Sequence, residues 1–126
     1  RKLAQLMKGH PEYKVSLKEI HHTQKLDAPS GTAISLAEQV MQAITGKKKW
    51  VNHESADDSD LVIVSERKDP APGTHSITYE SEIDDISITH TAHNRKGFAT
   101  GAVLAAEFLN GHRSGAFGMS DVLQID

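Results

Sequence analysis

The chain has 126 residues, of which 37% are hydrophobic and 25% are charged, and its formal net charge is -3. This composition is typical of one globular domain with a modest core, and the small negative charge argues against nucleic acid as a partner. Cysteine is absent, which excludes disulfides and thiolate metal sites, and no apolar run approaches the ~20 residues of a membrane span. We expect a cytoplasmic protein that does not bind membranes.

The first nine residues, RKLAQLMKG, have the apolar spacing of the last turns of a helix. Leu3, Leu6 and Met7 fall on one side, and Gly9 is a suitable stop. No residue that favours a helix start precedes them, so the chain begins inside an element. We therefore expect an excised domain rather than a whole natural protein.

The next segment, residues 13–21, alternates apolar and polar residues and predicts a half-buried strand. The same period places Glu19 and His21 on its apolar side. Polar groups fit there only where the core ends and a cleft begins. We expect His21 to face that cleft, and the adjacent His22 to diverge from it.

A helix is predicted for residues 33–45, because apolar residues recur there at helical spacing, and Gly46 is its expected stop. Ser30 or a neighbour caps the start of this helix. The backbone N–H groups of Gly31 and Thr32, with the Thr32 hydroxyl, can hold the two oxygens of a carboxylate or phosphate. The helix start is therefore a candidate site for a small anion.

Two imidazoles and an ammonium precede this helix in the run HHTQKLDAPSGT. Lys25 adds a positive charge, and His21 and His22 can donate hydrogen bonds or transfer protons near neutral pH. Adjacent histidines on a strand diverge and Lys25 repels cations, so we expect no metal. Asp27 is expected to bind the loop or cap the helix rather than to take part in catalysis.

Residues 47–60 are polar and are expected to form a loop, followed by strands at 61–67, 74–82 and 85–93. The last two strands are separated by only two residues and predict a hairpin with one apolar face and one Ser/Thr face. KDPAPG, residues 68–73, is a rigid turn. We interpret Glu66 and Arg67 as charges at a strand end.

The segment FATGAVLAAEFL, residues 98–109, is apolar around its circumference and predicts a helix buried on all sides. A domain of this size can hardly enclose it, so we expect part of its surface to meet another domain or subunit. Arg95, just before this helix, is either a surface residue or the guanidinium that grips a carboxylate or a cofactor phosphate. His75, His90 and His93 lie on the hairpin strands, where two of them could line the same cleft.

Three collinear stretches resemble a known family. EIHHTQKLDAPSGTA, from Glu19 to Ala33, closely resembles the signature of bacterial dihydrodipicolinate reductase, also called 4-hydroxy-tetrahydrodipicolinate reductase, of lysine and diaminopimelate biosynthesis. The similarity continues through ITHTAHNRKGFATGAVLAAEFL and SGAFGMSDVL and so covers nearly all of the chain.

The resemblance implies that residues 1–126 are the C-terminal substrate-binding and oligomerisation domain of a two-domain reductase. Segments 1–9 and about 97–126 would pack towards a dinucleotide-binding domain, which is absent here because the chain has no GxGxxG loop. The implied fold is α+β, an open mixed, largely antiparallel sheet of about four strands with helices packed on one face. The other face would join further subunits in a homotetramer.

The resemblance also implies roles for individual residues. His21 resembles the catalytic proton donor and acceptor, and Lys25 the catalytic proton donor. The expected substrate is a cyclic dicarboxylate, reduced with NADPH or NADH that the absent domain mainly binds. The expected substrate ligands are His22, Ser30, Gly31 and Thr32. Arg95 and Phe98 fall where the chain returns towards the cofactor, which is a weaker transfer.

Two other functions remain open at this point. The chain alone is expected to bind substrate and oligomerise without reductase activity, because it lacks the cofactor domain. The alternative is a non-catalytic anion- or metal-binding oligomerisation module, which would bind Zn²⁺ tightly or be protected by phosphate at its helix start.

Overall fold

The computed structural model describes residues 1–111 and 114–125, and the chain divides into two compact units, residues 1–93 and residues 94–126. The first unit carries every residue of the HHTQKLDAPSGT run. Its elements are α1 (Lys2–Met7), β1 (Lys14–His21), α2 (Gly31–Ala43), β2 (Lys49–Val51), β3 (Asp60–Arg67), β4 (Gly73–Glu80) and β5 (Asp85–Ala92).

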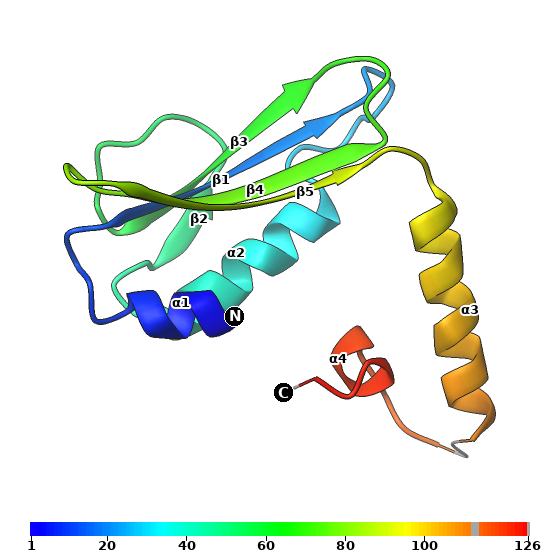
Figure 1. Cartoon of the computed structure of the whole chain (residues 1–126). Helices are drawn as coiled ribbons and strands as arrows, with labels where there is room; N and C mark the ends of the chain where they lie inside the picture. Colours follow the sequence, from blue (N-terminus) through cyan, green and yellow to red (C-terminus); the bar gives the residue numbers. More distant parts are fainter. Residues whose placement is uncertain (112–113, 126) are drawn as a thin grey trace. The chain divides into compact units, whose positions relative to one another are not determined.

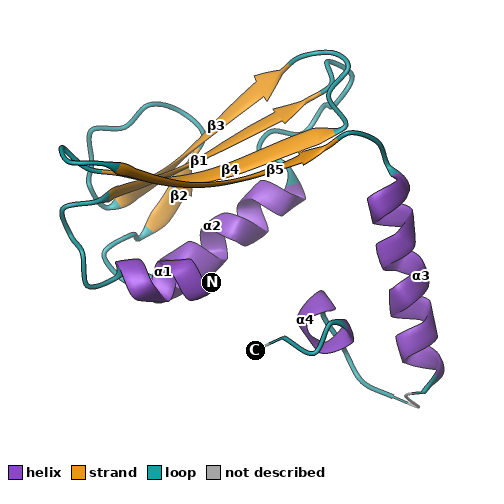
Figure 2. Ribbon diagram, viewed as in Figure 1, coloured by secondary structure: helices purple, strands orange, loops and turns teal. Residues whose placement is uncertain are grey.

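The five strands of the first unit form one open sheet in the order β2-β3-β1-β4-β5 (Figure 2). The central strand β1 pairs parallel with β3 and antiparallel with β4, so the sheet is mixed as expected. The expected number of strands was about four, and the additional one is β2, within the segment expected to be a loop. A three-residue strand is too short to show a period in the sequence, and it exists because it pairs with β3.

Helices α1 and α2 cover one face of this sheet (Figure 1), which confirms the predicted α+β arrangement. The core lies between these two helices and the sheet. Val15 and Leu17 of β1 point into it, in the predicted alternation, and β3 adds Leu61 and Ile63, both fully buried. Burial of such side chains contributes roughly 1.5–3 kcal/mol each, so this layer holds β1 firmly in place.

Helix α2 begins at Gly31 and ends at Ala43, with Ile44 as its C-terminal cap. The predicted helix end at residue 45, with Gly46 as its stop, was therefore wrong, because the helix ends two residues before that end. The prediction of the start is confirmed, since the Ser30 hydroxyl accepts a hydrogen bond of 3.2 Å from the Ala33 N–H. This is the contact expected of an N-terminal cap.

Strands β4 and β5 form the predicted hairpin, with residues 81–84 as its loop. Ile77 lies opposite Ile88, and Tyr79 opposite Ile86, on the apolar face. The other face carries three hydroxyl pairs across the two strands: Thr74–Thr91, Ser76–Thr89 and Thr78–Ser87, at 3.4, 2.9 and 2.9 Å. The predicted Ser/Thr face therefore exists, and no helix of this unit covers it.

The second unit contains α3 (Lys96–Asn110) and α4 (Met119–Val122), and residues 112, 113 and 126 lie outside the described part of the chain. The helix predicted at 98–109 is present, but none of its described residues is buried. Val103 is 57% and Leu109 50% exposed. Burial on all sides was therefore wrong within this chain. Packing of this segment and of residues 1–9 against another domain stays a prediction.

No helix among the described residues has both the length and the apolar character required to cross a membrane.

Candidate functional site

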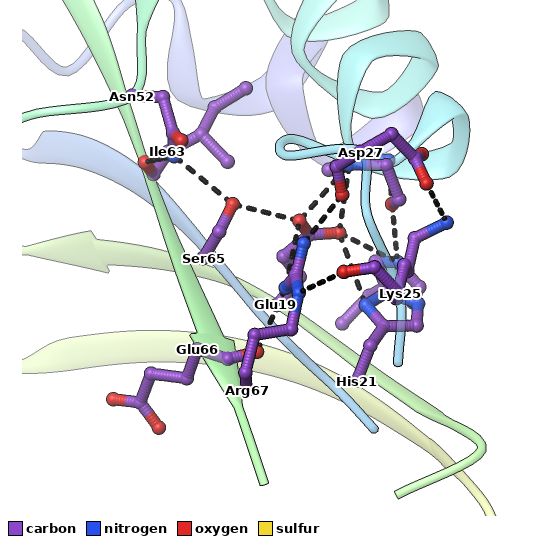
Figure 3. Close-up of polar contacts among 12 residues, drawn as sticks. Glu19, His21, Lys25, Asp27, Asn52, Ile63, Ser65, Glu66 and Arg67 are labelled. Carbon is purple, nitrogen blue, oxygen red and sulfur yellow. Dashed lines mark hydrogen bonds and ion pairs between the residues drawn. The ribbon is translucent and has the colours of Figure 1, made fainter. Parts of the chain in front are cut away.

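The end of β1 brings a charged side chain into the buried face of the sheet. Glu19 is 0% exposed and His21 is 8% exposed, and both follow the buried Val15 and Leu17 on the same face of the strand. An ionised carboxylate at such a position is tolerated only when other groups bind it. The partners of Glu19 therefore define the site (Figure 3).

The Glu19 carboxylate accepts hydrogen bonds from two segments distant in the sequence. The Ser30 backbone N–H donates to both oxygens, at 3.0 and 3.2 Å, and the Ser65 hydroxyl donates to Oε1 at 2.7 Å. The Arg67 guanidinium lies 3.8 Å from Oε1. Burial alone would raise the pKa of Glu19, but the hydrogen bonds with Ser30 and Ser65 and the nearby His21 hold it below its usual range. Glu19 is therefore a carboxylate at neutral pH.

Two imidazoles face the second oxygen of this carboxylate. Nδ1 of His21 lies 3.4 Å and Nε2 of His75 lies 3.6 Å from Glu19 Oε2, and the ring centroids of the two histidines are 5.0 Å apart. Burial lowers the pKa of His21 despite the opposing charge of Glu19, and burial and His21 lower the pKa of His75. Both rings are held towards the neutral form, which can accept as well as donate a proton.

Arg67 ties the loop after β1 to the same site. Its Nε donates to the Lys25 carbonyl at 3.2 Å, and its Nη2 donates to the Asp27 carbonyl at 2.5 Å. Within that loop the Lys25 ammonium donates to the Asp27 carboxylate at 2.8 Å. The Lys25 contact, with a backbone hydrogen bond, lowers the pKa of Asp27. These contacts agree with the structural role expected for Asp27.

The start of α2 completes the arrangement. The Ser30 hydroxyl lies 3.2 Å from His75 Nε2 while it caps the helix, so one side chain joins the helix start to the imidazole pair. Gly31 and Thr32 are exposed in the first helical turn, where backbone N–H groups have no intrahelical acceptor. The anion-binding features predicted for this segment therefore lie beside the buried histidines.

The structure gathers most of the predicted site residues into the first unit, although their roles stay predictions. His21, Ser30 and His75 are in contact, and His90 lies opposite His75 on β5. His22 is half-buried at the strand end, as expected for a diverging neighbour. Arg95 and Phe98 belong to the second unit, and their roles stay predictions.

Sequence analysis missed Glu19, Ser65 and Arg67 as members of the site. Glu19 carried a usable signal, a charge at an apolar position of a strand. Ser65 and Arg67 carried none, because they reach the site only through the parallel pairing of β1 with β3, which aligns Glu19 with Ser65 and His21 with Arg67. Glu66, on the other face, forms an ion pair with Lys18 at 2.6 Å.

One group among the described residues has the donor atoms of a metal site. Ligand atoms of Glu19, His21 and His75 lie within 4.8 Å of one another. The guanidinium of Arg67 and the ammonium of Lys25 are close to the same groups and disfavour a cation. The arrangement is therefore better suited to an anion and to proton transfer.

A large hollow of about 670 Å³ lies elsewhere, beside α1 and the beginning of β1. Met7, Lys8, Tyr13, Ala43 and Lys47 are among its lining residues, and none of the predicted site residues reaches it. The position of the candidate site is therefore indicated by its chemistry and not by the size of a cavity.

Comparison with known proteins agrees with the motif. Residues 1–123 match the family model described as dihydrodipicolinate reductase, C-terminus. The chain belongs to this family. The HHTQKLDAPSGT run had implied the same C-terminal domain of dihydrodipicolinate reductase.

Named relatives of this domain are reductases of about twice its length. The chain is 52% identical over 123 residues to the 4-hydroxy-tetrahydrodipicolinate reductase of Christiangramia forsetii, with 98% of the chain and 51% of that protein covered. The enzyme of the same name from Methanosarcina mazei is 36% identical, with 90% and 44% covered. The chain thus spans about half the length of these curated relatives.

A solved structure has the same fold. It is a dipicolinate-bound dihydrodipicolinate reductase from Paenisporosarcina sp. TG-14, 28% identical, with a TM-score of 0.62. The match covers 82% of this chain and 42% of that chain.

Proposed function

We propose that this chain is the substrate-binding and oligomerising part of a 4-hydroxy-tetrahydrodipicolinate reductase, which reduces a cyclic dicarboxylate to tetrahydrodipicolinate. The observation that carries the proposal is the convergence of His21, Lys25 and the start of α2 around the buried Glu19. Positive and proton-donating groups beside free backbone N–H groups suit a small ligand with carboxylates. The neighbour from Paenisporosarcina, described as dipicolinate-bound, supports this class of ligand.

The proposed contacts follow from the first turn of α2. The N–H groups of Gly31 and Thr32 bind one carboxylate of the substrate, and a Cβ built on Gly31 would meet nothing within 4 Å, so that side of the turn is open to a ligand. Ser30 holds this turn in place by its cap. His22, at the edge of the site, is the proposed side-chain ligand.

In the proposed reaction the hydride comes from a cofactor that another domain mainly binds, and the proton comes from side chains of this chain. A nicotinamide cofactor, NADPH or NADH, supplies the hydride. Among the described residues, the candidates for contact with that cofactor are the exposed Arg95 and Phe98 at the start of α3, which suit a phosphate and an apolar contact, and its main binding surface is proposed to belong to another domain.

Hydride addition to the ring leaves an electron-rich enamine that takes up one proton. His21 and Lys25 are the proposed proton donors, and the Lys25 ammonium stabilises negative charge that develops during reduction.

We also propose that the parent protein is a cytoplasmic homotetramer assembled through the open face of the sheet. The supporting observation is the uncovered Ser/Thr face of β4 and β5, together with the edge strand β5, whose residues from Asp85 to Thr91 are all exposed. An edge strand of eight residues without cover is uncommon in an isolated domain.

The proposed roles of His21 and Lys25 are tested in the full-length reductase. We expect His21→Ala and Lys25→Ala each to lower kcat by roughly 10²–10⁴-fold, the contribution of a general acid. NAD(P)H oxidation measures the rate, and thermal unfolding monitors the fold. Gln39→Ala, on the exposed side of α2, is the control. An unchanged kcat in both variants would refute the assignment.

A further inference from the structure

We infer that Glu19 is a positioning residue for His21: it accepts the Nδ1–H of the imidazole and so directs Nε2 towards the substrate as the atom that exchanges the proton. The inference deepens the proposed function, on which it rests for the role of His21 in proton transfer. This role is additional to the hydrogen bond by which Glu19 binds the Ser30 N–H at the start of α2.

The first step is the burial of Glu19. Its side chain is 0% exposed, and it receives the Ser30 N–H and the Ser65 hydroxyl, with Arg67 at 3.8 Å. These groups arrive from the start of α2 and from β3, so they fix both carboxylate oxygens in space. A carboxylate held in this way is a rigid acceptor for a third donor.

The second step is the surroundings of the His21 ring. Nδ1 is buried and makes no hydrogen bond among the described residues, and Glu19 Oε2 lies 3.4 Å from it. A small shift of the ring would bring this pair to hydrogen-bond distance, and catalytic hydrogen bonds are often long before substrate binds. Since an ionised carboxylate only accepts, the favoured tautomer of His21 carries its proton on Nδ1.

The third step is the other nitrogen. Nε2 of His21 faces Gly73 at the start of β4, where a built Cβ would lie only 3.2 Å away. Because glycine leaves that space open, Nε2 is not covered by a side chain at this position. The Nδ1–H tautomer therefore leaves the lone pair of Nε2, or its proton after protonation, on the side of the ring that faces Gly73.

A purely structural role for Glu19 makes a different prediction. If the carboxylate served only to bind Ser30 and Ser65, Glu19→Gln would keep an acceptor oxygen for them and leave the tautomer and the position of the His21 ring unchanged. If Glu19 also holds His21, the loss of its negative charge removes the group that stabilises the protonated imidazole. The remaining charged groups near His21 are Lys25, Arg67 and, when protonated, His22 and His75.

The removal of the Glu19 charge has a definite sign. None of these remaining neighbours is negative, and each one that is positively charged disfavours the imidazolium form of His21. In Glu19→Gln the pKa of His21 therefore falls further. If protonated His21 is the donor, the alkaline limb of the plot of kcat against pH moves to lower pH.

Nitrogen-15 NMR of labelled histidines in this chain tests the inference without a measurement of enzymatic activity. In the wild-type chain at neutral pH we expect His21 to show the Nδ1–H tautomer, and a predominant Nε2–H tautomer would overturn the inference. This measurement needs no variant, so it decides the matter even if Glu19→Gln does not fold.

The variant extends the test. In Glu19→Gln the midpoint of the His21 titration should move to lower pH, whereas Glu66→Gln, which removes a carboxylate on the opposite face, should leave it in place. Equal midpoints in the wild type and in Glu19→Gln would contradict the inference.

Kinetics of the full-length reductase separate this inference from the proposed function. Glu19→Gln should lower kcat by roughly 10–100-fold, part of the roughly 10²–10⁴-fold that a general acid supplies, with little change in KM. An unchanged kcat in His21→Ala would refute the proposed role of His21 in proton transfer, while the NMR experiment still decides the tautomer. A kcat loss in His21→Ala without one in Glu19→Gln would refute the positioning role alone.

Discussion

Gly73 determines how closely β4 can approach the imidazole of His21. A Cβ at this position would lie 3.2 Å from Nε2 and 3.5 Å from Cδ2 of His21, and 3.9 Å from Cε1 of His75. The residue also has φ of +158°, a value that residues with a side chain rarely adopt. Glycine is therefore needed here both for its backbone conformation and for space.

Gly73→Ala should displace the His21 ring and lower the free energy of unfolding by about 1–3 kcal/mol, the usual effect of an additional methyl group in a packed site. Urea unfolding of this chain measures the stability, and the His21 NMR signals report the ring. Gly46→Ala is the matched control, because a Cβ at Gly46 would meet nothing within 4 Å. Wild-type stability and unchanged His21 signals in Gly73→Ala would contradict the packing argument.

At the residue scale, sequence reasoning succeeded where the signal was local. Ser30 was identified as the helix cap because it precedes an amphipathic segment, and the structure has that hydrogen bond. The position of His21 on the apolar side of β1 followed from strand alternation, and the residue is buried there. The contacts of Arg67 were missed because a charge at a strand end has the same local pattern whether it faces solvent or binds a carbonyl 42 residues away along the chain, as Arg67 does with Lys25.

Ser30 connects the stability of an element to the site. Its hydroxyl accepts from the Ala33 N–H at 3.2 Å, and its backbone N–H donates to Glu19. Ser30→Ala keeps the backbone contact and removes the cap, which should cost about 1 kcal/mol of unfolding free energy. Denaturant unfolding checks this value.

The control for the cap is Ser35→Ala, at an exposed position of the same helix. Alanine has the higher helix propensity, so this variant should be as stable as the wild type or slightly more so. Equal stability of Ser30→Ala and Ser35→Ala would show that the cap contributes nothing measurable.

The elements that could be predicted are those with a clear internal period. The alternation in β1 and the alternating apolar and Ser/Thr residues of the β4–β5 hairpin are repeated over several residues, and the structure confirms both elements. Strand β2 and the parallel pairing of β1 with β3 depend on segments distant in the sequence, so no local pattern indicated them. The end of α2 was predicted too far along the chain, because glycine commonly follows a helix end and Gly46 was taken for it, whereas the helix ends at Ala43.

At the scale of the whole molecule, the open face of the sheet leads to a prediction about assembly. If this face joins subunits, the chain should have the mass of four copies in light scattering at micromolar concentration. Thr89→Arg, in the middle of the hydroxyl pairs, should reduce that mass, because a bulky charge on a packed sheet face is costly.

The control for assembly is Gln39→Arg, on the exposed side of α2, which faces away from the sheet and should leave the mass unchanged. A monomeric wild-type chain would contradict assembly through this domain alone. Equal masses for the wild type and Thr89→Arg would show that another surface joins the subunits.

The surroundings of α3 could not be obtained from the sequence. The apolar composition of α3 predicted a buried helix, but composition alone does not say which chain supplies the cover, and within this chain α3 is exposed. Family membership, by contrast, was evident from the sequence, because three collinear stretches resemble the same family, and the family model matches residues 1–123.

The contacts of Glu19 also limit how the motif could be used in protein design. The twelve residues of HHTQKLDAPSGT, cut out as a peptide or grafted onto another loop, would lack Ser65 and Arg67 from β3 and His75 from β4. A working transplant needs three adjacent strands in the β3-β1-β4 order, with Glu19 at a core position of the middle one. The smallest portable unit is therefore a piece of sheet and not a loop.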